Sequence, residues 1–239
     1  FRGDRAIQIS RAFDTPAGPF PFDRVRVPRV AFAGLMEYDG DLHIPQSYLV
    51  SPPVIEETSG EYLAAAGLRT FACSETQKFG HVTYFWNGNR SGHFDDKLET
   101  YVEIPSNAPP FEAVPAMKAA EIADVTIAAI GSGKYDVLRV NFANGDMVGH
   151  TGLLAPTIAA CEAVDIALGR LLAANDAADG ITIVTADHGN ADEMALRDKQ
   201  GQPMLDAQGK VLPRTAHSLA PVPFVVTGKG LSPTARMRK

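Results

Sequence analysis

The fold is decided by a strand–helix–strand stretch: DVLRVNF at residues 136–142, PTIAACEAVDIALGRLLAA at residues 156–174 and ITIVTA at residues 181–186. The two outer segments are short and mostly apolar, which is typical of strands that are buried on both faces of a sheet. The middle segment begins with proline and carries apolar residues at helical spacing, which predicts a long helix. A strand, a helix and a second strand in this order indicate parallel pairing.

Further strands and helices are predicted on either side of this stretch. Further strands are predicted over residues 69–73, 82–86 and 222–227, and helices over residues 56–66 and 115–130. The first fifty residues are mixed, with helical spacing over 5–13 and an extended segment over 25–36. We therefore expect an α/β fold with a mostly parallel sheet and helices on both faces. A proline-rich loop over residues 39–53 is the best candidate for a domain boundary.

Composition excludes several classes of protein. The chain has 239 residues, a net charge of −6 and 45% hydrophobic residues, which is enough for a folded core. An acidic balance argues against nucleic-acid or membrane-surface partners, and no apolar run approaches the roughly 20 residues of a membrane span. Cys73 and Cys161 are too few for a disulfide framework, which favours a reducing, cytoplasmic setting.

Metal-ligating side chains gather where the predicted strands end. Asp146 and His150 follow the first strand, Asp187 and His188 follow the second, and His217 precedes the last. Ligands bind beyond the carboxyl ends of such strands, and Asp and neutral His hold divalent ions such as Zn and Mn. Asp187 could instead cap a helix, and His217 could be an ordinary loop histidine. Convergence on one sheet edge favours a metal site, where the 187–188 pair would hold one ion or bridge two.

Three cations are candidates for binding an anion. Arg2 and Arg5 are three residues apart, a spacing that on a helix puts both on one face, where two guanidinium groups can bind a carboxylate or phosphate. Lys78 follows the strand at 69–73, so it points to the same edge as the metal ligands and would suit a phosphoryl group. The alternatives are a solvated helix start and an ordinary surface lysine. His43 and His93 are expected at the surface or in packing, and His81 is left open.

Several segments resemble a known family. They are FRGDRA at residues 1–6, SETQKFGHVTYFWNG at 74–88, the Asp146–His150 segment, TADHGN at 185–190, the His217 segment and PVP at 221–223. Over essentially its whole length the chain resembles an internal or C-terminal segment of the cofactor-independent (2,3-bisphosphoglycerate-independent) phosphoglycerate mutases of the alkaline phosphatase superfamily. The plant and trypanosomatid members are the most similar.

The resemblance implies a monomeric enzyme with two domains and two divalent ions, usually Mn and sometimes Co, Zn or Mg. By this resemblance, residues 1–50 would end the transferase domain and so be a remnant of a second α/β domain. Residues 51–239 would form the larger part of the phosphatase-like domain, whose fold is alkaline phosphatase-like. One ion would take Asp146, His150 and His217; the other would take Asp187 and His188 with an Asp and a Ser from outside this chain. The resemblance assigns phosphoglycerate binding to Arg2, Arg5 and Lys78.

The implied reaction interconverts 3-phosphoglycerate and 2-phosphoglycerate through a phosphoserine, without 2,3-bisphosphoglycerate. No serine of this chain matches the family's nucleophile, so we expect the chain alone to lack turnover. The alternatives are another phosphomutase or phosphatase of the same superfamily, or a catalytically dead metal-binding fragment. The arginine pair and the Lys78 motif favour the mutase.

Overall fold

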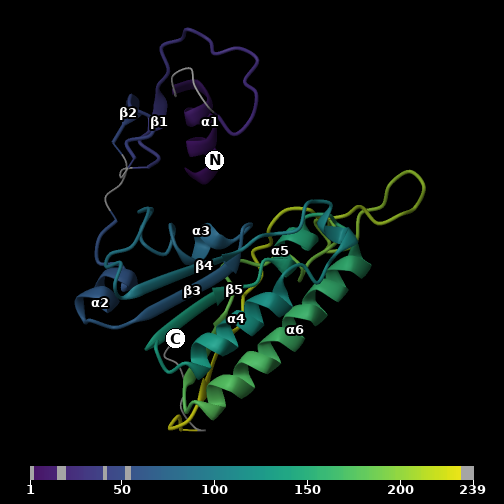
Figure 1. Cartoon of the computed structure of the whole chain (residues 1–239). Coiled ribbons are helices and arrows are strands. Elements are labelled where there is room, and N and C mark those ends of the chain that lie inside the picture. The colour runs from purple at the N-terminus through teal and green to yellow at the C-terminus, as the bar shows by residue number, and fades with distance from the viewer. Residues whose placement is uncertain (1–2, 15–19, 40–41, 52–54, 233–239) are drawn as a thin grey trace. The chain divides into compact units, whose positions relative to one another are not determined.

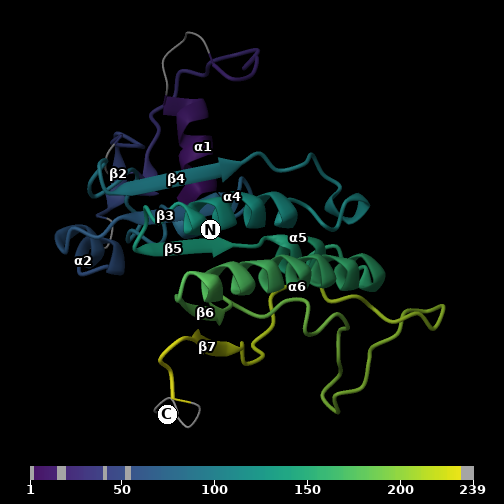
Figure 2. The same ribbon diagram turned by 60° about the horizontal axis from the view of Figure 1, so that its bottom comes forward.

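The computed structural model describes residues 3–14, 20–39, 42–51 and 55–232. Two compact units emerge from the contacts: Phe1–Leu68 with Gly80–Thr100, and Arg69–Phe79 with Tyr101–Lys239. Figure 1 labels the helices and the first five strands, and Figure 2 labels strands β6 and β7. The domain boundary expected at residue 50 stays a prediction.

The first unit holds short elements joined by long loops. Helix α1 spans Gly3–Asp14, strands β1 (Gly34–Met36) and β2 (Tyr48–Val50) pair in parallel, and helix α2 spans Ser59–Ala65. Thr58 caps α2 by accepting a hydrogen bond from the backbone N–H of Glu61. Both helices were predicted, but only the last three residues of the extended segment over 25–36 form a strand. Val25 in that segment is 93% exposed, so burial does not favour a strand there.

The strand predicted over residues 82–86 is wrong. Helix α3 spans Phe79–Val82 and continues into turns, in which the N–H of Phe85 donates to Gly80 and the N–H of Asn87 donates to Thr83. Val82 is buried, and the rings of Tyr84 and Phe85 meet edge to face. The apolar and aromatic residues that suggested a strand therefore pack within a compact turn. Such residues can be buried without an extended backbone.

The second unit contains a three-stranded sheet in the order β4 (Glu99–Ile104), β3 (Thr70–Glu75) and β5 (Val137–Asn141). Strands β3 and β5 are parallel, with Thr70 opposite Val137, and Figure 2 shows the β4 and β5 arrows pointing the same way. The sheet has a face that packs on helix α4 (Ala119–Gly131), where Phe71 and Cys73 meet Ile122. The predicted α/β class with parallel strands and flanking helices is confirmed.

Two helices pack closely beside this sheet. Helix α6 (Leu154–Ala177) lies along α4, and both figures show the two side by side. Small residues allow the close approach, since Ala119 and Ala123 of α4 meet Ala167 of α6 in one buried cluster. The 3-10 turn η1 (Phe111–Ala113) and the short helix α5 (Asn144–Gly149) complete this layer. None of the described helices is both long enough and apolar enough to cross a lipid bilayer.

The last two strands form a separate sheet. Strand β6 (Ile181–Thr185) pairs antiparallel with β7 (Phe224–Gly228), rather than extending the parallel pattern. The reason lies in the excursion between them, residues 186–223, whose arms fold back on each other. Isolated antiparallel bridges link these arms at Gly189–Ser218, Ala195–Pro213, Arg197–Pro203 and Leu205–Val211. The chain therefore returns alongside β6 in the reverse direction.

Candidate metal centre

Asp146 and His150 lie on the one and a half turns of helix that follow β5. Strand β5 ends at Asn141, helix α5 begins at Asn144, and His150 is its C-terminal cap residue. Residues four apart share a helix face, so His150 Nε2 lies 3.0 Å from Asp146 Oδ1. The spacing recognised in the sequence therefore brings one carboxylate oxygen and one imidazole nitrogen together.

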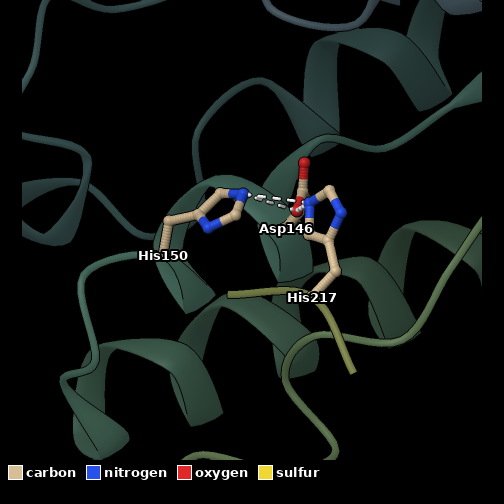
Figure 3. Close-up of side chains that lie close together, drawn as sticks. All are labelled: Asp146, His150 and His217. Atoms are coloured by element: carbon tan, nitrogen blue, oxygen red, sulfur yellow. Dashed lines mark hydrogen bonds and ion pairs between the residues drawn. The ribbon is translucent and has the colours of Figure 1, made fainter. Parts of the chain in front are cut away.

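His217 reaches the same carboxylate from the loop that precedes β7. Its Nε2 lies 3.1 Å from Asp146 Oδ1 and 3.2 Å from His150 Nε2. Figure 3 shows the two rings approaching Asp146 from different segments of the chain. The three ligand atoms all lie within 4.8 Å of one another. The structure thus brings together the three residues predicted for one ion, while the binding of an ion stays a prediction.

The protonation of His150 suits a metal ligand. Its Nδ1 lies 2.7 Å from the backbone carbonyl oxygen of Thr215, which can only accept a hydrogen bond. Nδ1 therefore carries the proton in the neutral ring, and Nε2 keeps its lone pair toward the cluster. Hydrogen bonds of this kind orient metal-binding histidines in proteins and fix their tautomer. One carboxylate oxygen and two imidazole nitrogens fit a divalent transition metal.

Lys78 forms ion pairs with both Asp146 and Asp187. Its ammonium lies 2.7 Å from Asp146 Oδ2 and 3.5 Å from Asp187 Oδ2, and the lysine side chain is only 5% exposed. Burial would raise the pKa of Asp146, but the hydrogen bond and charge of Lys78, with Asn190 and His150, lower that pKa to about 2. The carboxylate is therefore ionised at neutral pH, as a metal ligand must be.

Asp187 and His188 lie beside this cluster. His188 Nε2 is 3.4 Å from Asp187 Oδ2, and the His188 ring stacks on the His217 ring with centroids 3.6 Å apart. The Nδ1 atom of His188 is buried and has no hydrogen-bond partner among the described residues. The five predicted metal ligands thus gather at one place in the second unit. Whether the 187–188 pair holds a second ion stays a prediction.

The structure describes one member of the predicted arginine pair. Arg2 falls outside the described residues. Arg5 is an exposed residue of α1 in the first unit, where it donates to Gln8 Oε1 at 3.2 Å. Substrate binding by either arginine therefore stays a prediction.

Residues that the sequence did not single out complete the site. Asn190 donates from Nδ2 to Asp146 Oδ1 at 2.8 Å and to the Asp146 carbonyl at 3.2 Å. Gly149 makes room for it, because a Cβ there would lie 2.5 Å from Asn190 Oδ1. The motif at 187–190 contains Asn190, but nothing in the sequence indicates that its amide would face Asp146. The same holds for Arg214, which contacts the backbone of the His217 loop.

Comparisons with known proteins agree with a metal centre. A family model described as the metalloenzyme superfamily matches residues 21–239. A 2,3-bisphosphoglycerate-independent phosphoglycerate mutase of Trypanosoma brucei brucei is 55% identical over 238 residues, which is 100% of this chain and 43% of the relative. A protein of Arabidopsis thaliana, described as a probable 2,3-bisphosphoglycerate-independent phosphoglycerate mutase, is 55% identical over 240 residues, which is 100% of this chain and 43% of the relative.

A solved structure gives the same result for the fold. The chain superimposes on Leishmania mexicana phosphoglycerate mutase, crystallised at low cobalt concentration, with a TM-score of 0.93 and 56% identity. The match covers 97% of this chain and 42% of that one, so the chain spans less than half the length of the relatives it matches. With a family model over most of its residues and metal-ligating side chains assembled in one cluster, this chain belongs to the metalloenzyme superfamily.

Proposed function

We propose that the protein containing this chain interconverts 3-phosphoglycerate and 2-phosphoglycerate, independently of 2,3-bisphosphoglycerate, in glycolysis and gluconeogenesis. The observation that carries this proposal is the Asp146, His150 and His217 cluster beside the buried ammonium of Lys78. It combines a divalent-ion donor set with a fixed cation, which is what transfer of a phosphoryl group requires. The relatives from T. brucei brucei and A. thaliana carry the name of this activity.

Two divalent ions are part of the proposal. Asp146, His150 and His217 would hold one, and Asp187 and His188 would hold part of the shell of the other, with an Asp and a Ser outside this chain completing it. Mn is our first choice, Co or Zn suits the same nitrogen and oxygen donors, and Mg is the option with the strongest preference for oxygen. When bound, the ions would supply positive charge for activating an oxygen nucleophile and for neutralising the phosphoryl oxygens.

The chain's own residues would bind and position the substrate. Lys78 would donate to the oxygens of the transferring phosphoryl group, and Arg2 and Arg5 would hold the glycerate. The serine outside this chain would attack phosphorus and form phosphoserine. The phosphorus–oxygen bond to glycerate would break, and the glycerate oxygen would take up the proton that the serine loses. After glycerate turns, the reverse step would place the phosphoryl group on its other hydroxyl and restore the serine.

The proposal extends to the setting of the reaction. Residues 1–50 would end a transferase domain and residues 51–239 would form most of a phosphatase-like domain, in a monomeric cytoplasmic enzyme whose partner is the small-molecule substrate. We propose that the nucleophilic serine is not among these 239 residues, in which case this chain by itself would have no turnover.

The test is an assay of the full-length protein with Mn²⁺ and 3-phosphoglycerate, following 2-phosphoglycerate. We expect His217→Ala and Lys78→Met to lower turnover by at least about a hundredfold, the scale on which removing an electrostatic catalytic group acts. His43→Ala is the matched control, because the His43 side chain is 79% exposed and pairs with Glu37 in the first unit. Release of inorganic phosphate in place of 2-phosphoglycerate would indicate a phosphatase of the same superfamily and contradict the proposal.

A further inference from the structure

Arg214 spreads its guanidinium group over the loop that presents His217. Its Nη2 donates to the His217 carbonyl at 2.8 Å, and its Nε donates to the Ala216 carbonyl at 3.3 Å. The remaining nitrogen, Nη1, lies 3.3 Å from Glu193 Oε2 in an ion pair whose side chains are 27% and 31% exposed. One side chain therefore binds two successive backbone carbonyls and is itself held by a carboxylate.

Besides the Arg214 side chain, the middle of this loop is held by the hydrogen bond from His150 to the Thr215 carbonyl and by the contacts of the His217 ring. Thr215, Ala216 and His217 are all exposed, and the loop is neither helix nor strand. Its two ends are fastened to the other arm of the excursion. At one end the Arg214 N–H donates to the Met194 carbonyl at 3.0 Å, and at the other the N–H of Ser218 donates to the Gly189 carbonyl at 2.9 Å. Between these anchors, the Arg214 side chain fixes the direction of the peptide groups.

Both histidine ligands depend on this short loop. His217 is part of it, and the direction of its side chain follows from the backbone that Arg214 holds. His150 is on α5, but its Nδ1 bonds to the Thr215 carbonyl, which lies in the same loop. A change in the loop would therefore move the Nε2 atom of His217 and remove the hydrogen bond that orients His150. Outer groups of this kind set the affinity of a metal site as the direct ligands do.

We propose that Arg214 is a positioning residue of the metal centre, which aligns His217 and, through the Thr215 carbonyl, the ring of His150. This inference rests on the metal site of the proposed function. Arg214 would contact neither the ion nor the substrate; its effect would be on how well two of the three ligands are arranged before an ion arrives.

Arg197 provides a matched comparison. It is paired with the same carboxylate, with its Nε 3.4 Å from Glu193 Oε1, and its side chain is 47% exposed. Its Nη1 donates to the carbonyl of Gly201, on its own arm of the excursion. Replacing Arg197 therefore removes a similar charge and a similar ion pair, without removing a hydrogen bond to the loop of His217.

The experiment measures Co²⁺ binding to the full-length protein by competition with a chelator and by the visible absorption of the bound ion. The component of the titration that His217→Ala abolishes reports this site. We expect Arg214→Gln to weaken that component by about tenfold and to change its absorption bands, since altered outer groups typically cost 10–100-fold in affinity. Arg197→Gln should leave both unchanged. The melting temperature of the metal-free Arg214→Gln protein should stay within about 3 °C of the unsubstituted protein.

Other results would overturn the inference. Equal weakening by Arg214→Gln and Arg197→Gln would mean that only charge near Glu193 matters, and unchanged affinity in Arg214→Gln would remove the positioning role. If Arg214→Gln does not fold, Arg214→Lys serves instead, because it keeps the charge but lacks the fork that binds two carbonyls; it should also bind Co²⁺ about tenfold more weakly. If His217→Ala leaves Co²⁺ binding unaltered, the metal site itself is wrong, which separates that failure from a failure of Arg214 alone.

Discussion

Replacing Lys78 with methionine should loosen helix α5 in the metal-free protein. The change removes the ammonium 2.7 Å from Asp146 Oδ2 while keeping the length of the side chain. Without that charge, a carboxylate whose side chain is 13% exposed would lose its strongest ionic partner. Asp146 is in the first turn of α5, so the free energy of opening this helix should fall.

The size of the effect follows from the pKa of Asp146. Burial would raise this pKa, but the hydrogen bond and charge of Lys78, with Asn190 and His150, lower it from 3.8 to about 2. At about 1.36 kcal/mol per unit, the depression corresponds to about 2 kcal/mol of stability. Because the folded-state pKa is depressed, this stability is fully present above about pH 4 and is lost as the pH falls through about 2.

Hydrogen exchange of α5 measures this directly. In the full-length protein with a chelator at pH 7, Lys78→Met should lower the protection of residues 144–149 by roughly 10- to 30-fold, because Lys78 is the largest of the groups that lower the pKa of Asp146 and so accounts for most of the about 2 kcal/mol. Lys118→Met is the control, since its ion pair with Glu121 is more exposed and such pairs contribute roughly 0–1 kcal/mol. In the unsubstituted protein, the share of the protection that ionised Asp146 provides should be lost as the pH falls from about 4 through about 2. Unchanged protection of α5 in Lys78→Met would refute the reasoning.

Two further predictions concern other parts of the second unit. Gly149→Ala should weaken Co²⁺ binding several-fold, because its Cβ would lie 2.5 Å from Asn190 Oδ1 and turn that amide away from Asp146. Gly145→Ala is the control and should bind Co²⁺ normally, because a Cβ there meets nothing within 4 Å. Equal Co²⁺ affinities of the two variants in a chelator titration would contradict this prediction. A thiol reagent should modify Cys161, which is exposed, and spare Cys73 in the folded protein. Burial in the core raises the pKa of Cys73 to about 11, so mass spectrometry that finds Cys73 labelled at the rate of Cys161 would count against the packing described.

The sequence was most informative where a local rule decides the structure. The pairing of Asp146 with His150 follows from four-residue spacing on a helix, and the strand over 136–142 follows from its apolar residues. The segment around Val82 was misread because β-branched and aromatic residues favour burial in turns as well as in strands. The antiparallel pairing of β6 and β7 could not be predicted either, since it depends on backbone bridges such as Gly189–Ser218 across the excursion.

The parts of the site that sequence reasoning missed are side chains that hold the predicted ligands or their backbone in place. Asn190 binds the carboxylate of Asp146, and Arg214 binds carbonyl groups of residues near it in the chain. A carbonyl acceptor carries no signature in the amino-acid letters, because every residue has one. Direct ligands are therefore visible as Asp and His in a pattern, while the groups that align them become visible only in three dimensions.

The excursion at residues 186–223 carries site residues at its base, while its far end can be changed without altering the site. Its far end contains two turns that close on themselves: Asp198 Oδ1 accepts hydrogen bonds from the N–H groups of Gln200 and Gln202, and Asp206 Oδ1 accepts them from Gln208 and Lys210. These hydrogen bonds are local to the two turns. The base of the excursion is held separately by the Gly189–Ser218 bridge, which joins the two segments that carry His188 and His217. The tip is thus a natural point for inserting a peptide tag or a fluorophore, because added length there is carried by solvent-exposed turns and leaves the base closed.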